Sequence, residues 1–522
     1  MQVLLDNPFG KETKTQSFTT DVLFCHVLVF IVKLGYTTVD DRNTLGYAYP
    51  LARRLFKILR TLKNTDFRPL RGGIPPNITD AALMKQQQAM VTACFVHFNF
   101  DTASVIRYIG GQHTAAHRNV KKITAELRRA GIKEQLVNDL ERIFTFGVPG
   151  ICNAHSSEEN FWAYLKYGNH KTVYEDIAQT TSTIMKEVCK GFALTADAEL
   201  TWFLTNLHLT PTGLINLSHP YKSPRLIFDS SFQPFPWCFA INDMTSKHTE
   251  PEIHFPKTWI LFLTWIWNLR ITYPRLEIYL CDDDVSGAFR HVKYNPNVVA
   301  LHAFLLFGAL FFFMGQTFGD TTSPANWEPV ARCCQHYAQF LWNQPDSVER
   351  AQPYLPKLQL APDPTTNERA SFVQATADTQ HQGVLDPAGK RKPPTFNHHV
   401  DDCFYADIGN YVQLGVAASV LALYQILSHP TPQHGDPVSW DKFQATYSHR
   451  RKVTGFNINS RTLQVSLPDY KREHLQALLD KWLQRKTYTL LDAAELLGLL
   501  NNLSSICRWM RPRYFALQNA AR

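Results

Sequence analysis

The pattern of apolar and polar residues changes character near residue 217. Residues 80–215 show mostly helical periods with short loops, and short apolar runs of strand length follow. Helical patterns alternate with these runs and take over again beyond Pro468. We therefore predict an α+β fold for the mixed part, with a mostly helical region before it. The predicted strands are Arg225–Phe228, Leu276–Cys281, Phe311–Met314, Phe396–Val400 and Thr462–Ser466.

The chain before residue 215 carries basic helices but no catalytic pattern. Residues 1–45 lack a clean period and helix caps, so no fold is predicted for them and a disordered segment fits. Tyr49–Arg71 and Thr114–Ala130 predict amphipathic helices rich in Lys and Arg, each followed by glycine. Their basic faces suit either solvent or a phosphate backbone, and solvent is the better interpretation.

Two apolar runs raise the question of a membrane. Val22–Val32 is too short to span a bilayer and lacks the flanks of a signal peptide. Val298–Gly315 is about long enough, but it contains His302 and Gly308 and continues into a polar loop. We interpret it as a buried helix followed by strands, and we predict a protein without a membrane partner.

The composition of the chain excludes few classes of protein. The net charge of +8 is compatible with a polyanionic partner but does not establish one. The ten cysteines show no CxxC spacing, which is typical of reduced thiols in an intracellular protein, nuclear or cytoplasmic. Residues 343–394 are polar, hold eight of the 30 prolines and show no periodicity, so they predict a long insertion or a disordered loop.

Two acidic segments carry the chemistry. Asp282, Asp283 and Asp284 come at the end of an apolar strand, and Asp401 and Asp402 lie between two apolar runs, at the tip of a predicted hairpin. Each cluster alone is commonly a solvated turn. Carboxylates that converge repel one another unless they bind cations, and hard oxygen ligands suit Mg²⁺. Two such ions about 3.5–4 Å apart can stabilise the attacking and leaving oxygens of a phosphoryl displacement.

Together the motifs resemble those of reverse transcriptases. Asp284-Val-Ser-Gly-Ala-Phe289 resembles the first palm motif, and His399-Val-Asp-Asp402 resembles the catalytic hairpin, with His399 where many members have Tyr. Gly315–Trp327 resembles the segment that positions nucleotide and template. Lys222–Asp229 resembles a fingers strand that grips the triphosphate. Lys452–Leu467 is similar to the primer grip hairpin, and Leu491–Leu503 to a thumb helix.

The resemblance covers roughly residues 217–522 and looks closest to DIRS-like or LTR-like retrotransposon enzymes. It implies a right-hand polymerase: fingers and palm over 216–467, a partial, thumb-like helical segment over 468–522, and a helical N-terminal region over 46–215. The implied activity is RNA-directed DNA synthesis on an RNA or DNA template-primer with dNTPs and two Mg²⁺ ions, or Mn²⁺. Protein partners are not indicated, and we expect no RNase H in this polypeptide.

The resemblance also assigns residue roles. Phe289 would exclude a ribose 2′-hydroxyl, although a core aromatic residue is the alternative. The implied catalytic acids and metal ligands are Asp284, Asp401 and Asp402, with the backbone carbonyl of Val285 as a further ligand. The implied nucleotide-binding residues are Lys222, Arg225, Asp229, Ala288, Phe289, Gln316, Ser323 and Pro324. The implied template-primer contacts are His399, Lys452, Val453, Thr454 and Gly455.

Two other functions stay open. One is an inactive or domesticated retroelement relic that acts as a nucleic-acid-binding protein, although all three acids and Arg225 are present. The other is a different two-metal enzyme such as a nuclease, which would not need Arg225, Phe289 or the Ser323-Pro324 segment.

Overall fold

The computed structural model describes residues 81–520 with interruptions, of which the longest are 111–118, 150–156, 216–223, 246–254, 355–383, 430–435 and 441–447. Several sequence predictions lie outside the described residues. They concern the first 45 residues, the run Val22–Val32, the basic helix over Tyr49–Arg71, and Lys222. The chain forms two compact units. The first comprises residues 1–253, 286–333 and 423–437, and the second comprises 254–285, 334–422 and 438–522.

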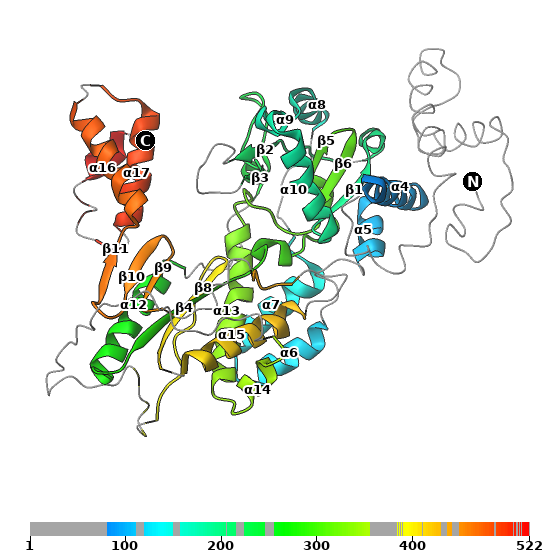
Figure 1. Ribbon diagram of the computed structural model, residues 1–522. Helices are drawn as coiled ribbons and strands as arrows, with labels where there is room; N and C mark the ends of the chain where they lie inside the picture. Colours follow the sequence, from blue (N-terminus) through cyan, green and yellow to red (C-terminus); the bar gives the residue numbers. More distant parts are fainter. Residues whose placement is uncertain are drawn as a thin grey trace, which may run out of the picture. The chain divides into compact units, whose positions relative to one another are not determined.

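The first unit combines helices with two small antiparallel sheets (Figure 1). One sheet has the order β1 (Ala193–Asp197), β6 (Ala309–Phe313), β5 (Ala303–Leu306). In the other, β2 (Thr212–Ile215) pairs with β3 (Arg225–Phe228), which confirms the strand predicted there. The helices are α4 (Ala81–His97), α5 (Thr102–Gly110), α6 (Val120–Arg129), α7 (Glu134–Phe146), α8 (Glu158–Tyr167), α9 (Thr172–Glu175), α10 (Ile177–Cys189) and α11 (Ile241–Met244), with the 3₁₀ turns η3 (Ala198–Trp202), η4 (Ala288–His291) and η5 (Val299–Leu301).

The apolar segment Val298–Gly315 is a hairpin, so the prediction of a buried helix followed by strands is wrong in its first half. After η5, strands β5 and β6 pair with Phe307 and Gly308 in the turn between them. Their φ angles of 49° and 75° are both positive, as a type I′ turn requires. A short apolar run fits helix and strand alike, and here pairing with β1 satisfies the buried backbone. Among the described residues, no helix is both long and apolar enough to cross a bilayer.

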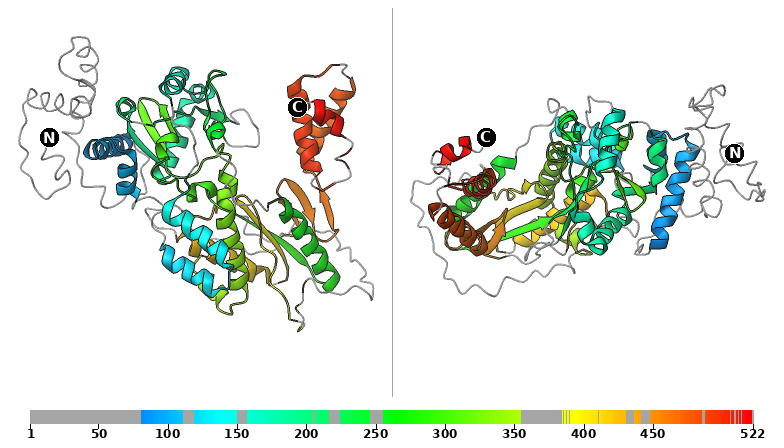
Figure 2. Two further views of the ribbon diagram at one scale, coloured as in Figure 1. Left: turned by 180° about the vertical axis from the view of Figure 1, so that it is seen from behind. Right: turned by 90° about the horizontal axis from the view of Figure 1, so that it is seen from above.

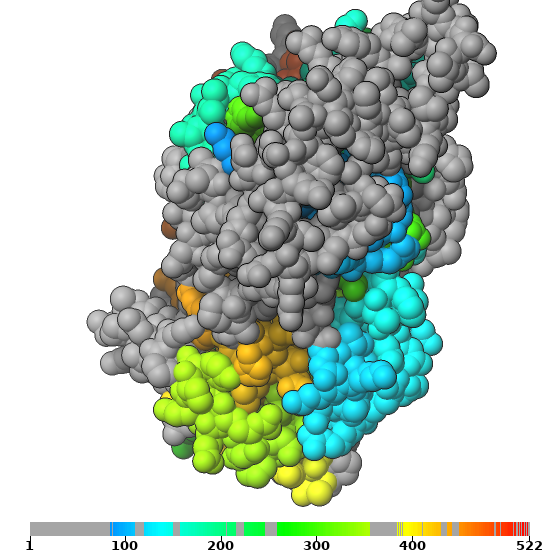
Figure 3. All heavy atoms as spheres, turned by 90° about the vertical axis from the view of Figure 1, so that its right-hand side faces the viewer, coloured from blue at the N-terminus to red at the C-terminus, as the bar shows by residue number. Residues whose placement is uncertain are grey.

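The basic helix predicted over Thr114–Ala130 is α6, which begins at Val120. The Asn119 side chain caps it by accepting a backbone N–H of the first turn at 3.1 Å. Arg128 forms ion pairs of 3.0 Å with two glutamates of α7. The two helices pack against each other, and their cyan atoms form part of the face seen in Figure 3. Part of the basic face is therefore already paired within the protein.

The second unit contains the acidic segments. β4 (Ile278–Asp284), β8 (Asp402–Ile408) and β7 (Asn397–His399) form an antiparallel sheet in the order β4-β8-β7. A second antiparallel sheet has the order β11-β10-β9. Its strands are β9 (Arg450–Val453), β10 (Phe456–Asn459) and β11 (Gln464–Ser466). The helices are α12 (Phe255–Thr272), α14 (Ser347–Ala351), α16 (Asp469–Gln484), α17 (Leu490–Leu503) and α18 (Phe515–Ala520), while α13 (Ser323–Trp342) and α15 (Tyr411–Leu427) have residues in both units.

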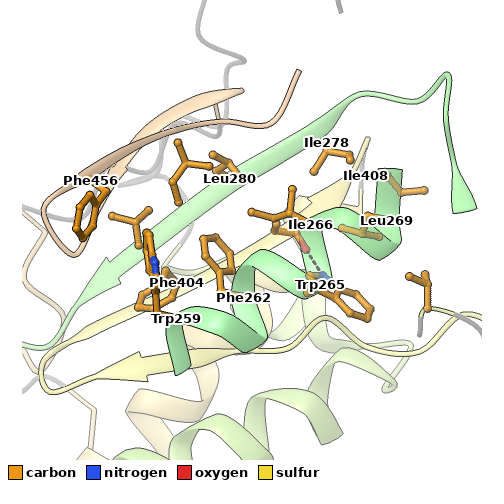
Figure 4. Packing of buried hydrophobic residues seen from close by; sticks show 14 residues of the cluster. Trp259, Phe262, Trp265, Ile266, Leu269, Ile278, Leu280, Phe404, Ile408 and Phe456 are labelled. Carbon is orange, nitrogen blue, oxygen red and sulfur yellow. Dashed lines mark hydrogen bonds between the residues drawn. The ribbon is translucent and has the colours of Figure 1, made fainter. Parts of the chain in front are cut away.

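One hydrophobic core joins α12 to both sheets of this unit (Figure 4), and the ribbon of α12 lies beside these sheets in Figure 2. The indole N–H of Trp265 on α12 donates to the carbonyl of Ala406 on β8 at 2.8 Å, which satisfies a polar group inside the core. Burying each large apolar side chain here contributes roughly 1.5–3 kcal/mol relative to its exposed state. The core includes Trp259, Phe262, Trp265, Ile266 and Leu269 of α12, Ile278 and Leu280 of β4, Phe404, Ala406 and Ile408 of β8, and Val453, Phe456 and Ile458 of the β9–β10 hairpin.

The polar segment 343–394 is structured at both of its ends, so the alternative of a disordered loop is wrong there, while the insertion stays a prediction. Helix α14 follows closely on α13, with Ser347 and Ala351 buried. Near the other end, Val384 is fully buried in the core around α12, and the Lys392 backbone N–H donates to its carbonyl. Residues 355–383 lie outside the described residues.

The chain after Pro468 is helical, as the periodicity predicted. A capping box fixes the start of α17, where Thr489 and Asp492 exchange side-chain to backbone hydrogen bonds. Lys481 of α16 also binds the Asp492 carboxylate at 2.9 Å, which links the two helices. The thumb-like role of this segment and the domain bounds given above stay predictions.

Candidate active site on an acidic strand pair

The three consecutive acids belong to strand β4 itself. The sequence had predicted that they follow the strand. β4 extends to Asp284 and pairs along its whole length with β8. In this register Asp284 lies directly opposite Asp402. Directly opposed residues place their Cβ atoms about 4.5–5.5 Å apart on the same face of a sheet. Two of the three predicted catalytic acids are therefore cross-strand neighbours.

Alternation along β4 divides its acids between two faces. Asp282 and Asp284 continue the row of Ile278 and Leu280, which packs into the core against α12. Asp283 has the opposite orientation. We call the face with Asp284 the front face of the sheet and the face with Asp283 the back face. Two residues beyond the apolar core, the front face thus becomes acidic.

The third acid, Asp401, occupies the turn of the predicted hairpin. His399 pairs with Asp402, so Val400 and Asp401 form a two-residue loop between β7 and β8. Val400 has a φ of 61°, the left-handed region that such tight turns need and that a β-branched residue rarely adopts. The Asp401 carbonyl accepts the Val285 backbone N–H at 3.1 Å, which ties the turn to the end of β4.

The front face carries a basic partner that the motifs did not indicate. The guanidinium of Arg451 on β9 is almost fully buried and forms an ion pair with the Asp282 carboxylate, which is 27% exposed. Burial raises the pKa of Asp282, and the charge of Arg451 opposes that effect. The pairing joins two strands 169 positions apart in the sequence.

The acid on the back face, Asp283, is shielded from water. Asp283 is 2% exposed and accepts a hydrogen bond from the Ser419 hydroxyl of α15. Burial raises the pKa of Asp283 to about 7, and repulsion from Asp282, Asp284 and Asp402 adds to the effect. Directly across from Asp283 lies Cys403, a thiol whose pKa burial also raises. The only sequence signal for this buried acid was its position between Asp282 and Asp284, which puts it on the opposite face of an extended strand.

The predicted primer grip is a tight hairpin in the same unit. Thr454 and Gly455 form its two-residue turn, both with positive φ, between Val453 and Phe456. Val453 points into the core, whereas Lys452 is exposed and donates to the Tyr470 hydroxyl at 3.2 Å. Alternation thus leaves Lys452 on the outer surface of the hairpin, as a phosphate contact would require.

His399, a predicted template-primer contact, belongs to the β4-β8-β7 sheet. It is exposed on β7, beside Asp402 of β8. Partial burial lowers the pKa of His399, while the charge of Asp401 opposes the shift. The ring is therefore more often neutral than an unperturbed histidine at the same pH.

The predicted triphosphate residues belong to the first unit. Arg225 is exposed at the start of β3, opposite Ile215. Asp229, just beyond that strand, is 3.1 Å from the Nε2 atom of His170. This histidine partner could not be predicted from the sequence pattern, because it lies 59 positions away.

The remaining nucleotide-binding candidates of the first unit are mostly buried. Phe289 is 5% exposed next to the buried Ala288, and its ring centroid is 5.0 Å from that of Phe318. Gln316 is fully buried, and its side-chain amide donates to the Thr322 hydroxyl at 2.9 Å. The Ser323 hydroxyl donates to the Thr317 carbonyl at 2.9 Å, where α13 begins. Pro324 follows in the first turn and is half-buried. Their roles toward a nucleotide stay predictions.

The described residues contain no group of three or more His, Cys, Asp or Glu side chains arranged as a metal site. Asp284 and Asp402 nevertheless supply the oxygen donors that Mg²⁺ prefers, from directly opposed positions. Asp401 belongs to the adjoining turn, next to Asp402 in the chain.

Comparison with known proteins adds little. No family model matches the chain, and no curated protein matches it. Among solved structures, a foamy viral protease-reverse transcriptase in complex with double-stranded DNA matches 77% of this chain and 56% of its own, at 13% identity and a TM-score of 0.38. A foamy viral protease-reverse transcriptase with an RNA/DNA hybrid matches 77% and 43%, at 13% identity and a TM-score of 0.36. The chain thus spans about half the length of these structures.

Proposed function

We propose that this protein is an RNA-directed DNA polymerase that adds dNTPs to a primer 3′-hydroxyl at the end of the β4–β8 strand pair. The observation that carries the proposal is the register that places Asp284 opposite Asp402, with Asp401 in the adjoining turn. These are the acids that the reverse transcriptase motifs single out. Catalysis would depend mainly on positioning and electrostatics, as in phosphoryl transfer generally.

Asp284, Asp401 and Asp402 would hold two Mg²⁺ ions, with the carbonyl of Val285 as a further ligand. When bound, the ions would supply the charge that lowers the pKa of the primer hydroxyl and neutralises the triphosphate. The protein's own part is to hold acidic oxygens at one end of a rigid sheet. The backbone bond from Val285 to Asp401 and the bond from Ser439 to the Asp284 carbonyl, at 2.9 Å, fix the strand ends that carry them.

The outer residues of the unit would bind the template-primer. Lys452 and the Thr454-Gly455 turn are accessible on the β9–β10 hairpin, where phosphate contacts need no base recognition. In the first unit, Arg225 is exposed on β3 and would contact the triphosphate. Such contacts suit an enzyme that copies any sequence.

The test is primer extension by the purified protein on a poly(rA)·oligo(dT) template with dTTP and Mg²⁺. The wild-type protein should extend the primer, and the double variant Asp401→Ala/Asp402→Ala should not. Asp346→Ala is the matched control, because Asp346 is an exposed acid of the same unit that contacts only its helix neighbour Arg350 in the ion pairs described. It should extend the primer as the wild type does.

Two results would contradict the proposal. One is a folded wild-type protein that extends nothing with Mg²⁺ or Mn²⁺ yet still binds the primer-template, which would favour the relic binding protein. The other is extension that persists in the double variant, which would place the chemistry elsewhere. A nuclease would instead shorten the labelled primer in the absence of dTTP.

A further inference from the structure

The β9–β10 hairpin and the acidic strand β4 are joined edge to edge. β4 has β8 on one side, and on the other side Leu280 exchanges two backbone hydrogen bonds with Ser448, at 2.8 and 3.3 Å. The Ser460 hydroxyl, just beyond β10, donates to the Ile278 carbonyl at 2.6 Å. The hairpin therefore continues the sheet that carries the acids, within one compact unit.

Within this junction, the Arg451–Asp282 pair lies closest to the acids. Asp282 is two residues before Asp284 on the same face of β4, and Arg451 directly precedes Lys452 on β9. The Arg451 guanidinium also reaches the Leu280 carbonyl at 3.5 Å, so its donors contact both a side chain and the backbone of β4. A planar fork of this kind fixes orientation as well as distance.

The pair is costly as a stabilising device. Its arginine side chain is 3% exposed, and removing a guanidinium from water costs free energy that a buried pair regains only with good geometry. Across the hairpin, the position opposite Arg451 is filled by Ile458, a core residue. An apolar residue at 451 would therefore suit the surroundings, which favours a role for the pair in geometry.

We infer that Arg451 and Asp282 are positioning residues that fix the hairpin carrying Lys452, Thr454 and Gly455 relative to Asp284. The inference rests on the proposed polymerase function. In that setting the hairpin holds the primer end and the acids hold the ions that activate it, so the pair sets the distance between the two. A misplacement of about 1 Å at such a site can cost about a hundredfold in rate.

The experiment compares single-turnover incorporation rates at saturating dTTP with affinities for the primer-template. Arg451→Met and Asp282→Asn should each lower the rate about ten- to a hundredfold, on the scale of such misplacement, with little change in primer-template affinity. The double variant should be no slower than the slower single variant, because the two residues act as one unit. Arg451→Lys keeps the cation without the fork and should fall between wild type and Arg451→Met.

Ile458→Ala is the matched control. It removes a buried side chain directly opposite Arg451 but leaves the ion pair, so it should lower the melting temperature without changing the rate. If Arg451→Met does not fold, Arg451→Lys and Asp282→Asn carry the same comparison.

Equal rate losses in Ile458→Ala and Arg451→Met would reduce the pair to ordinary packing and overturn the inference. Rate losses that multiply in the double variant would also overturn it. A failure of the polymerase function itself looks different: the wild-type protein would then incorporate nothing, and the inference would fall with it.

Discussion

Two neighbouring rows of side chains cross the β4-β8-β7 sheet, one on each face. The front row is Asp284, Asp402 and His399, and the back row is Asp283, Cys403 and His398. The rows contain similar chemical groups in strands of the same register. They differ in access: in the front row His399 is exposed, Asp402 half-buried and only Asp284 buried, at 7% exposed, whereas all three residues of the back row are buried.

The environments of the two rows give the same groups different properties. On the back face, burial raises the pKa of Asp283 to about 7 and lowers that of His398 to about 3. Burial thus favours a neutral imidazole and, up to about neutral pH, a protonated carboxyl. On the front face, Asp402 and His399 keep contact with solvent, whereas Asp284 is buried. The comparison teaches that an acid's position in the strand alternation decides which neighbours its carboxylate meets and how strongly burial shifts its pKa.

The largest expected effect comes from exchanging one acid in each row. Asp284→Asn should reduce primer extension by a factor on the order of 10²–10³, because one electrostatic partner of the transition state is lost. Asp283→Asn should retain most of the activity, since the amide can still accept a hydrogen bond from Ser419. Steady-state extension rates measure both. Equal losses in the two variants would break the distinction between the rows.

The front face should also depend on its core for stability. Phe404 is fully buried on β8, directly opposite Asp282, and packs edge-on against Phe262 with ring centroids 4.8 Å apart. Phe404→Ala should lower the free energy of unfolding by about 3–5 kcal/mol, because it leaves a cavity beneath the acids. Urea denaturation measures the change. Phe515→Ala, at a residue that is 59% exposed, should change it little.

The back face should make stability depend on pH through Asp283. Well below the ordinary carboxyl pKa of 3.8, this carboxyl is protonated in both the folded and the unfolded state. As the pH rises toward 7, the unfolded chain releases this proton while the folded protein keeps it, so this contribution to stability falls by up to about 1.4 kcal/mol per pH unit. Above about pH 7 the loss levels off.

Asp283→Asn should remove this dependence. Denaturation of the wild type and the variant between pH 4.5 and 8, a range chosen to bracket the shift, would show it as a growing relative advantage of the variant as the pH rises. Parallel curves would show that Asp283 titrates normally and that the back face is wetter than its burial indicates.

Sequence patterns predicted the elements of this sheet better than the surroundings of its acids. The strand Arg225–Phe228 and the hairpin around Asp401 follow from short apolar runs bounded by polar residues, a local signal. The extension of β4 through Asp284 could not be predicted in this way. Strands disfavour Asp, and here the exceptions depend on Arg451 and Ser419, which lie 169 and 136 positions from the acids they contact.

The same limit explains the mistaken helix over Val298–Gly315. Its apolar run had no alternation to read, because β5 and β6 are buried on both faces. The candidate acids were predictable because the motifs name them. The face on which each acid lies depends on the strand register. That register can be inferred from the sequence only once the extent of the strand is known.

The smallest effect expected concerns the turn that ends the front row. Val400 adopts a φ of 61°, where a side chain without a short polar group costs about 1–2 kcal/mol. Asn tolerates this region better, so Val400→Asn should raise the free energy of unfolding by up to about 1 kcal/mol. Val400→Thr is the matched control, because it adds a polar group but keeps the β-branch and its strain. If Asn stabilises the protein while slowing extension, the strained turn holds Asp401 in its working position. If Val400→Asn instead lowers the free energy of unfolding while Val400→Thr leaves it unchanged, the valine side chain stabilises the turn by packing. The front row would then depend on apolar contacts as far as the turn that ends it.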